Sequence, residues 1–409
     1  MEEEEIDWES REEAFKYLEE FGLKYTDGLL DILRLVNPKW LKDPEFIMKA
    51  VQIEGVALEF ASEELRKNPE IVKAAVQNNG YALEFASQEL CSNPEIVKAA
   101  VNNAGQALEF ASDELRNDNE IVLNAVHENG NALQFASEKL CNNPAIVSDA
   151  VWSKPEALEF ASDELRNDPK IVKIAVEYDG HALQYASDEL RNNSEIVSLA
   201  VRQNGHALQY ASDELRNNPE IVSLAVRQNG LALEYASDEL RNNPEIVSLA
   251  ISQRGRLSEY APEPLKYASD ELRNNPEIVL LAVGQNGKAL AYASEELRNN
   301  PQIVLEAMKQ NVDALLYAKE LCSNSEFIKK AIEIDGLALV YASKELRNNP
   351  DFIAMAKEKR TKQATKIEHT ASEIAEGIKP KQSDIDEAYA EITAEEEKDA
   401  HEQEGQEQE

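Results

Sequence analysis

Apolar and polar residues follow one pattern along most of the chain, and this pattern returns every 25 residues. It reads P-E-I-V-x-x-A-V-x-x-N-G-x-A-L-x-[FY]-A-S-x-E-L-R-N-N, and we number its positions 1 to 25 from the proline. Full copies begin at residues 44, 69, 94, 119, 144, 169, 194, 219, 244, 276, 301 and 325, and a fragment begins at residue 350. Two copies depart from the 25-residue length, with 32 and 24 residues. A fixed period of this kind indicates a repeat protein in which each unit stacks on its neighbours.

The first half of each repeat predicts an α-helix. Apolar residues at positions 3, 4, 7 and 8 form one stripe, as in Ile221, Val222, Ala225 and Val226. The residue before each start is Asn or Asp, which caps a helix by accepting a hydrogen bond from an exposed amide, and Pro suits the first turn. The predicted caps include Asn68, Asn93, Asn143, Asn218 and Asn243. Gly at position 12 is expected to end the helix in the left-handed conformation.

The second half of each repeat predicts another helix and then a separate turn. Positions 14, 15, 17, 18 and 22 cover an arc of about 160° on a helix, and the aromatic residue at position 17 is assigned to the core. Glu at position 21 falls inside this arc, so Ser at position 19 is predicted to cap a short final turn. The predicted fold class is all-α, a right-handed-type α-solenoid of about twelve 25-residue helical-hairpin repeats.

The pattern divides the chain into three regions. Residues 1–43 are expected to form an N-terminal helical cap with an acidic start, and residues 44–356 form the solenoid. Residues 357–409 contain a basic segment followed by an acidic tail, which is expected to be disordered because it has few apolar residues. Within the array, the irregular repeat at residues 244–275 carries Pro262 and Pro264, which interrupt helices. A loop or bend is therefore predicted at residues 256–267.

At this point the repeat is recognisable as a whole. The string PEIVSLAVRQNGLALEYASDELRNN, which begins at Pro219, resembles the repeat family named domain of unknown function 4116. The resemblance covers residues 44–349. Such repeats occur in bacteria associated with eukaryotic hosts and in some protists. The resemblance implies no activity, no cofactor and no catalytic residues, so it supports the repeat organisation alone.

Charge and composition disfavour several classes of function. The formal net charge is −36, which disfavours nucleic acids and anionic membranes because both are bound mainly through Lys and Arg. The three cysteines, Cys91, Cys141 and Cys322, are too few for a disulfide framework and fit a reducing compartment, so a cytoplasmic location is expected. The four Glu residues after Met1 do not resemble a signal peptide. We find no phosphate-binding loop, nucleophile motif or metal-ligand spacing, so no catalytic residue, cofactor or metal is predicted.

The leading functional hypothesis is a scaffold that binds a protein or peptide, with a basic partner favoured, along the repeat surface as a monomer. Glutamines at position 10 are candidates because they lie outside the apolar stripe and are able to bind an extended backbone. The candidate partner-binding residues are Arg202, Gln203, Arg227, Gln228, Gln253, Gln285 and Gln310. Delivery into a host cell as an effector is a further hypothesis that rests on the family's distribution. The alternatives are a passive spacer and a nucleic-acid-binding helical repeat; an enzyme is not expected.

Overall fold

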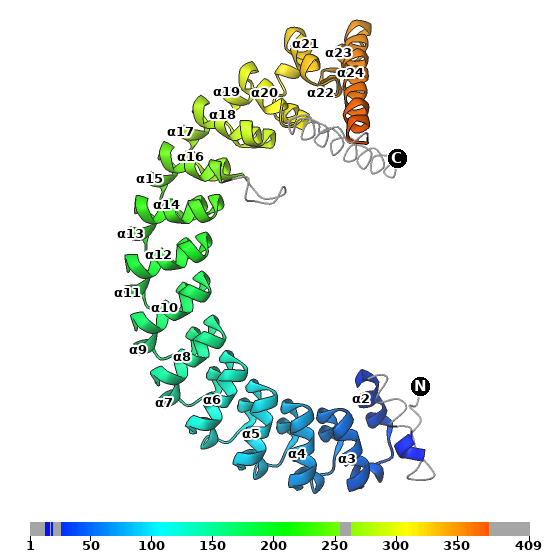
Figure 1. The fold of residues 1–409 in the computed structure, drawn as a ribbon, viewed down its shortest axis with the longest axis vertical. Coiled ribbons are helices and arrows are strands. Elements are labelled where there is room, and N and C mark those ends of the chain that lie inside the picture. Colours follow the sequence, from blue (N-terminus) through cyan, green and yellow to red (C-terminus); the bar gives the residue numbers. More distant parts are fainter. Residues whose placement is uncertain (1–12, 17, 19–25, 254–262, 376–409) are drawn as a thin grey trace. The chain divides into compact units, whose positions relative to one another are not determined.

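The computed structural model describes residues 13–16, 18, 26–253 and 263–375 (Figure 1). The chain divides into two compact units, Met1–Leu240 and Arg241–Glu409, which are called the N-terminal unit and the C-terminal unit below. Each unit is described by itself. The described residues form helices in tandem repeats without a β-strand, so the predicted all-α repeat solenoid is confirmed.

A regular repeat folds into the three predicted elements, a long helix, a second helix and a short final turn. In the repeat that begins at Pro169, these elements are α10 (Pro169–Tyr178), η10 (Gly180–Tyr185) and α11 (Asp188–Arg191), where η denotes a 3-10 helix. The predicted second α-helix was therefore wrong in its helix type. A 3-10 helix has three residues per turn, so it aligns positions 12, 15 and 18, which hold Gly, Leu and Ala.

The N-terminal unit contains eight of these repeats, preceded by a short helical segment. Its long helices are α2 (Thr26–Leu35), α3 (Pro44–Ile53), α4 (Pro69–Asn78), α5 (Pro94–Asn103), α6 (Asn119–Glu128), α8 (Pro144–Ser153), α10, α12 (Ser194–Gln203) and α14 (Pro219–Gln228). The six-residue 3-10 helices are η2 (Gly55–Phe60), η4 (Gly80–Phe85), η6 (Gly105–Phe110), η8 (Gly130–Phe135), η9 (Pro155–Phe160), η10, η11 (Gly205–Tyr210) and η12 (Gly230–Tyr235). The short elements are η1 (Trp40–Lys42), η3 (Leu65–Lys67), η5 (Leu90–Ser92), η7 (Leu115–Asn117), α7 (Glu138–Cys141), α9 (Asp163–Arg166), α11, α13 (Asp213–Arg216) and α15 (Asp238–Arg241).

The C-terminal unit is less regular. Its elements are α16 (Pro244–Ser252), η14 (Pro264–Tyr267), α17 (Asp270–Arg273), α18 (Pro276–Gln285), η15 (Gly287–Tyr292), α19 (Glu295–Arg298), α20 (Pro301–Met308), η16 (Val312–Tyr317), η17 (Leu321–Ser323), α21 (Ser325–Ile334), α22 (Ala338–Tyr341), α23 (Lys344–Arg347) and α24 (Pro350–Ala375). The last helix runs through the basic segment, so the boundary expected near residue 357 lies inside α24. Residues 376–409 lie outside the described residues.

The long helices begin where the sequence predicts. The side-chain oxygens of Asn68, Asn93, Asn218 and Asn243 each accept bonds from two backbone amides of the first turn, and that of Asn143 accepts one. The predicted final turn is also confirmed, because Ser at position 19 caps it. In α11, the Oγ atom of Ser187 accepts a hydrogen bond from the amide of Leu190 at 3.2 Å. Local capping therefore sets the start of two of the three elements.

Stacking buries the same positions in repeat after repeat. Val172 and Ala175 of α10 and Leu183 of η10 have no exposed surface. Long helices pack on the long helices of neighbouring repeats, and 3-10 helices pack on 3-10 helices, so two layers run through the N-terminal unit. The aromatic residues at position 17 of this unit, such as Phe160 and Tyr185, are only half-buried, so their assignment to the core was wrong. They border the surface instead.

The last part of the irregular repeat packs like the second half of the other repeats. Leu265 is fully buried and Ala268 and Leu272 are buried, so the stretch that begins at η14 fills the usual second half of a repeat. Pro264 is tolerated because it starts η14, where its amide hydrogen is not needed. Residues 254–262 lie outside the described residues, so the loop or bend at residues 256–267 stays a prediction.

Candidate functional site

The connectivity of a repeat gives the array two different edges. Each long helix begins beside the short element of the preceding repeat and ends where its own 3-10 helix begins. We call positions 9–13 the glycine edge, after the Gly at position 12, and positions 19–24 the serine edge, after the capping Ser. In the N-terminal unit, the short helices α7, α9, α11 and α13 lie on the outer side of the curve that this unit follows (Figure 1).

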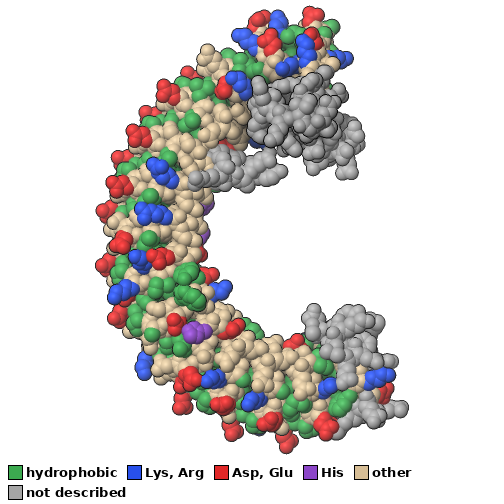
Figure 2. Space-filling view, viewed as in Figure 1, with side chains coloured by type: hydrophobic (Ala, Val, Ile, Leu, Met, Phe, Trp, Pro, Cys, Tyr) green, Lys and Arg blue, Asp and Glu red, His purple; other side chains and the backbone are tan. Residues whose placement is uncertain are grey.

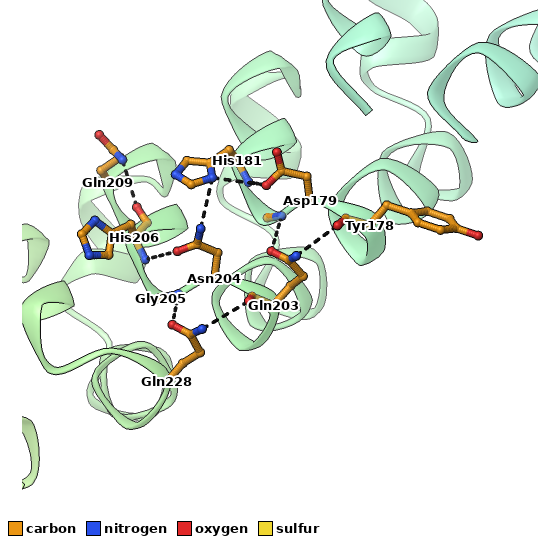
Figure 3. Close-up of polar contacts among 10 residues, drawn as sticks. Tyr178, Asp179, His181, Gln203, Asn204, Gly205, His206, Gln209 and Gln228 are labelled. Carbon is orange, nitrogen blue, oxygen red and sulfur yellow. Dashed lines mark hydrogen bonds and ion pairs between the residues drawn. The ribbon is translucent and has the colours of Figure 1, made fainter. Parts of the chain in front are cut away.

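The glycine edge is held together by a side chain at position 10 that bridges two repeats. The backbone amide of Gly180 donates to Oε1 of Gln203 at 2.7 Å, and Nε2 of Gln203 donates to the carbonyl oxygen of Tyr178 at 3.0 Å (Figure 3). Both partners belong to the repeat before that of Gln203. We call this pair of bonds the amide clamp. It satisfies backbone groups that no helix satisfies at the junction of α10 and η10.

The amide clamp recurs through the N-terminal unit. Gln228 accepts from the amide of Gly205 at 2.7 Å and donates to the carbonyl oxygen of Gln203 at 3.3 Å. Asn78 and Asn103 make the same pair of bonds with the preceding repeat, and Ser153 accepts from Gly130 at 3.2 Å. The expectation that Gln203 and Gln228 form a ladder open to a peptide is therefore corrected. Their amide groups bind the neighbouring repeat because a Gln at the end of a helix reaches across the stack.

The other predicted partner-binding residues do not repeat one geometry. Gln285 is the exposed last residue of α18, whereas Gln253 caps the end of α16 and Gln310 lies beyond the end of α20. Arg202 and Arg227 sit at position 9 of two adjacent repeats, and both are exposed on the glycine edge. The structure thus brings Arg202 and Arg227 to one edge, but it does not bring the five glutamines into one row.

The glycine at position 12 is required by close packing between repeats. The cap residue before it is extended, as at Asn204, and none of the glycines described at position 12 has a positive φ, so the predicted left-handed ending was wrong. A Cβ atom on Gly205 would lie 2.5 Å from the carbonyl oxygen of Ala225 in the next repeat. The same overlap would arise at Gly80, Gly130 and Gly180. Side chains are therefore excluded by the stack and not by the backbone conformation.

One pair of repeats replaces the glycine and the amide clamp together. Position 12 holds Pro155, which has no amide hydrogen to donate, and position 10 of the next repeat holds Tyr178. The Tyr178 ring meets Trp152 edge to face with ring centroids 6.5 Å apart, and 65% of Trp152 and 54% of Tyr178 are exposed. In Figure 3 the Tyr178 side chain points away from the polar network. The sequence carries part of this signal, because Pro155 replaces the glycine that most copies have at position 12.

Side chains at position 13 meet the aromatic residue at position 17 of the next repeat. His181 lies edge-on to Tyr210 with centroids 6.1 Å apart, and His206 lies edge-on to Tyr235 at 5.6 Å. The His181 ring also contacts Asp179 at 3.2 Å and Asn204 at 3.1 Å (Figure 3). Burial, and then the neighbouring His181, lowers the pKa of His206. In these repeats, histidines at position 13 and tyrosines at position 17 therefore lie side by side.

The serine edge is occupied by bonds between repeats. Asn142 accepts a bond from Ser162 at 2.6 Å and donates to Glu164 at 3.2 Å, and both partners lie in the following repeat. This arrangement explains the Glu at position 21, which the apolar arc could not accommodate. Asp at position 20 pairs with Arg at position 23 in several repeats, as in Asp163 with Arg166. Figure 2 shows these red and blue side chains along the edge of the N-terminal unit.

Comparison with known families agrees with the repeat organisation. The model of the family described as Domain of unknown function (DUF4116) matches residues 43–91, 93–141, 118–166, 146–191, 168–216, 218–266, 262–298, 276–321 and 324–360. These segments together cover more than half of the chain. The chain belongs to this family. No curated protein matches it.

The cysteines of the DUF4116 array all replace the usual Arg at position 23. All three thiols are free, and burial raises the pKa of each one, of Cys91 and Cys141 as of Cys322. The Sγ atom of Cys141 donates to the carbonyl oxygen of Leu133 at 3.4 Å. A raised pKa lowers the fraction of reactive thiolate, so these groups do not resemble nucleophiles.

Two further kinds of site were sought in the DUF4116 array. Among the described residues, no group of three His, Cys, Asp or Glu side chains is arranged to hold a metal ion. No helix in the described part of the chain combines the length and the apolar character needed to cross a membrane. The remaining candidate is the exposed glycine edge.

Proposed function

We propose that this DUF4116 protein is a scaffold that binds a protein or peptide partner through the glycine edge of its N-terminal unit. The observation that carries the proposal is the separation of roles between positions. Position 10 makes the amide clamp in four repeats of the N-terminal unit, and positions 19, 21 and 24 make bonds along the serine edge. The side chain at position 9 differs in its chemistry among the repeats.

The residues at position 9 support a binding role. Four consecutive repeats place His127, Trp152, Glu177 and Arg202 there, followed by Arg227. Trp and Arg are enriched among the residues that contribute most to protein interfaces. Solenoids present such variable columns to partners on a continuous surface, while the constant positions keep the stack rigid. The side chains at position 9 therefore favour a partner-binding scaffold over a passive spacer, because a spacer does not require this variation.

Nucleic acid is a weaker candidate for the partner. The chain carries 78 acidic and 42 basic residues, so its field repels phosphate groups. Arg166, Arg191 and Arg216 are also paired with aspartates of their own helices. A protein or peptide partner, and a basic one in particular, is therefore favoured.

Affinity purification with two matched variants tests the proposal. The glycine-edge variant changes Trp152, Arg202 and Arg227 to Ser, and the serine-edge control changes Asp163, Asp188 and Asp213 to Ser. The control residues have 92–93% exposed side chains, and surface ion pairs of this kind contribute little to stability. We expect a saturable partner that binds the wild type and the control and is lost from the glycine-edge variant. A spacer would give no partner that depends on these residues.

A further inference from the structure

Two exposed aromatic rings stand on neighbouring long helices of the N-terminal unit. Trp152 lies on α8 and Tyr178 on α10. Their rings are in edge-to-face contact, with the ring centroids 6.5 Å apart. More than half of each residue is exposed. Large aromatic residues on a surface are costly in water and are typical of binding sites, where they bury much area with few rotatable bonds.

The stabilising amide clamp is missing between the repeat that contains Pro155 and the repeat that contains Tyr178. In four other repeats of the N-terminal unit a Gln or Asn at position 10 binds the glycine amide of the preceding repeat. Here Pro155 removes the amide hydrogen, and Tyr178 directs its ring to solvent (Figure 3). Its backbone carbonyl still accepts the bond from Gln203, so the stack continues on the far side. The ring of Tyr178 therefore has no part in the amide clamp.

Carboxylates outnumber basic groups in the two repeats that carry these rings. Glu156 and Glu159 lie on η9, Asp179 joins α10 to η10, and these elements pack against one another. The pKa of the Tyr185 phenol is raised by burial first and then by Glu159, Glu156, Tyr210 and Asp179. The two repeats that span residues 144–193 contain ten acidic and five basic residues. An incoming cation would thus meet a negative field beside aromatic faces.

Three of the five basic side chains of these repeats lie beside carboxylates, and with the exposed Lys154 and Lys170 included the two repeats keep a formal net charge of −5. Arg166 and Arg191 pair with Asp163 and Asp188 on the serine edge. Lys173 lies 4.0 Å from Glu177 and 3.9 Å from Glu195. A planar guanidinium stacks on Trp and Tyr rings while its edge donates to carboxylates, which an aliphatic side chain is unable to do.

We propose that Trp152 and Tyr178, together with Glu156 and Glu159 of η9, form the docking site for an arginine-containing basic segment of the partner. This inference rests on the proposed scaffold function and specifies the chemistry of its partner. The rings supply the stacking surface, and the carboxylates select a positive charge. Selection by charge and stacking together distinguishes the site from a general apolar patch.

Fluorine NMR on the full chain labelled with 5-fluorotryptophan tests the site. The probe is a peptide with four copies of Gly-Ser-Arg, and the comparison peptide carries neutral citrulline in place of each arginine. Measurements use about 0.15 M salt, at which long-range attraction is screened. The Trp152 signal is identified with Trp152→Phe. We expect the arginine peptide to shift this signal saturably and the citrulline peptide to leave it unchanged.

Substitutions separate stacking from apolar contact. Trp152→Leu keeps an apolar side chain without the ring, and we expect it to weaken arginine-peptide binding about ten-fold, measured by isothermal titration calorimetry because this variant lacks the fluorinated reporter. Tyr81→Leu is the matched control, because Tyr81 is also exposed (41%) but bonds to Gln106 in another pair of repeats. Binding that is equal for wild type and Trp152→Leu overturns the inference, as does an equal response to the citrulline peptide.

A parallel capture of partners distinguishes this inference from the scaffold function. A saturable partner that is lost from the glycine-edge variant, yet binds Trp152→Leu as tightly as wild type, keeps the scaffold function and overturns the basic-segment site. Failure of the wild-type array to capture any saturable partner overturns the scaffold function itself. A partner whose binding falls with Trp152→Leu, and which competes with the arginine peptide, supports both.

Discussion

The N-terminal and C-terminal units are built from the same repeat pattern but carry different side chains at position 16. In the N-terminal unit this position holds Glu or Gln in all eight repeats, for example Glu159. In the C-terminal unit it holds Lys266, Ala291, Leu316 and Val340, and the last two are 54% and 53% exposed. Position 16 is exposed both in the 3-10 helix that holds Leu316 and in the α-helix that holds Val340, so packing does not decide which residue stands there. The difference therefore belongs to the surface and not to the fold.

The units also differ in how well the second element keeps its form. The N-terminal unit has a six-residue 3-10 helix in every repeat, whereas η14 has four residues and α22 is an α-helix. The C-terminal unit contains both repeats that depart from the 25-residue length. The second element is held mainly by contacts between repeats, so it changes when the spacing changes, while the capped long helices persist.

The largest expected effect contrasts one glycine from each unit. Gly205→Ala places a Cβ atom 2.5 Å from the carbonyl oxygen of Ala225, and we expect it to lower the free energy of unfolding by about 2–3 kcal/mol. Gly284→Ala adds a Cβ atom to α18 with no heavy atom within 4 Å, and we expect a gain of about 0.5–1 kcal/mol. Urea unfolding followed by circular dichroism measures both. Equal effects would contradict the close-packing explanation.

The next effect concerns the amide clamp. Gln203→Ala leaves the amide of Gly180 without its acceptor, and we expect a loss of about 1–2 kcal/mol. Gln310→Ala, at the same position beyond the end of α20, is expected to change stability by less than about 0.5 kcal/mol. Hydrogen exchange at Gly180 gives a local measurement, and its protection should fall only in Gln203→Ala. A Gln310→Ala variant as unstable as Gln203→Ala would argue for a clamp in both units.

A smaller effect is expected on how the free energy of unfolding depends on pH. It compares two residues at position 13, His206 of the N-terminal unit and Lys288 of the C-terminal unit. Burial, followed by His181, lowers the pKa of His206, so the unfolded chain binds this proton more readily than the folded chain. The stability from neutral His206 is therefore present above the unfolded pKa of about 6.5 and is lost as the pH falls toward the folded value. Urea midpoints at pH 7.5 and pH 5 should differ less in His206→Gln than in the wild type. Lys288→Gln is the control and should leave the difference unchanged.

The smallest effect on stability is expected at position 16. Changing both Leu316 and Val340 to Glu gives the C-terminal unit the chemistry of the N-terminal unit. We expect the free energy of unfolding to change by less than about 0.5 kcal/mol, because both side chains are exposed. Binding of the apolar dye ANS to the folded protein should decrease. A large loss of stability would show that these residues pack inside the C-terminal unit.

Part of the candidate site could be predicted from the sequence. Exposed Arg202 and Arg227 fall on the glycine edge because position 9 lies outside the apolar stripe. The role of Gln203 could not be predicted in the same way, because its partners at Gly180 and Tyr178 belong to another repeat. The exposed pair of Trp152 and Tyr178 was missed for the same reason. The joint change at Pro155 and Tyr178 was visible, but only the stack shows that these two positions face each other.

The sequence by itself determined the period, the long helices and their caps, because each depends on residues within a few positions of one another. Asn218 caps α14 through amides two and three residues ahead, and this geometry is local. The tertiary structure decided the 3-10 form of the second element, the need for glycine at Gly205 and the direction of the Gln203 side chain. These depend on the distance between neighbouring repeats, since a carbonyl oxygen of one repeat occupies the space where the preceding repeat would place a Cβ atom.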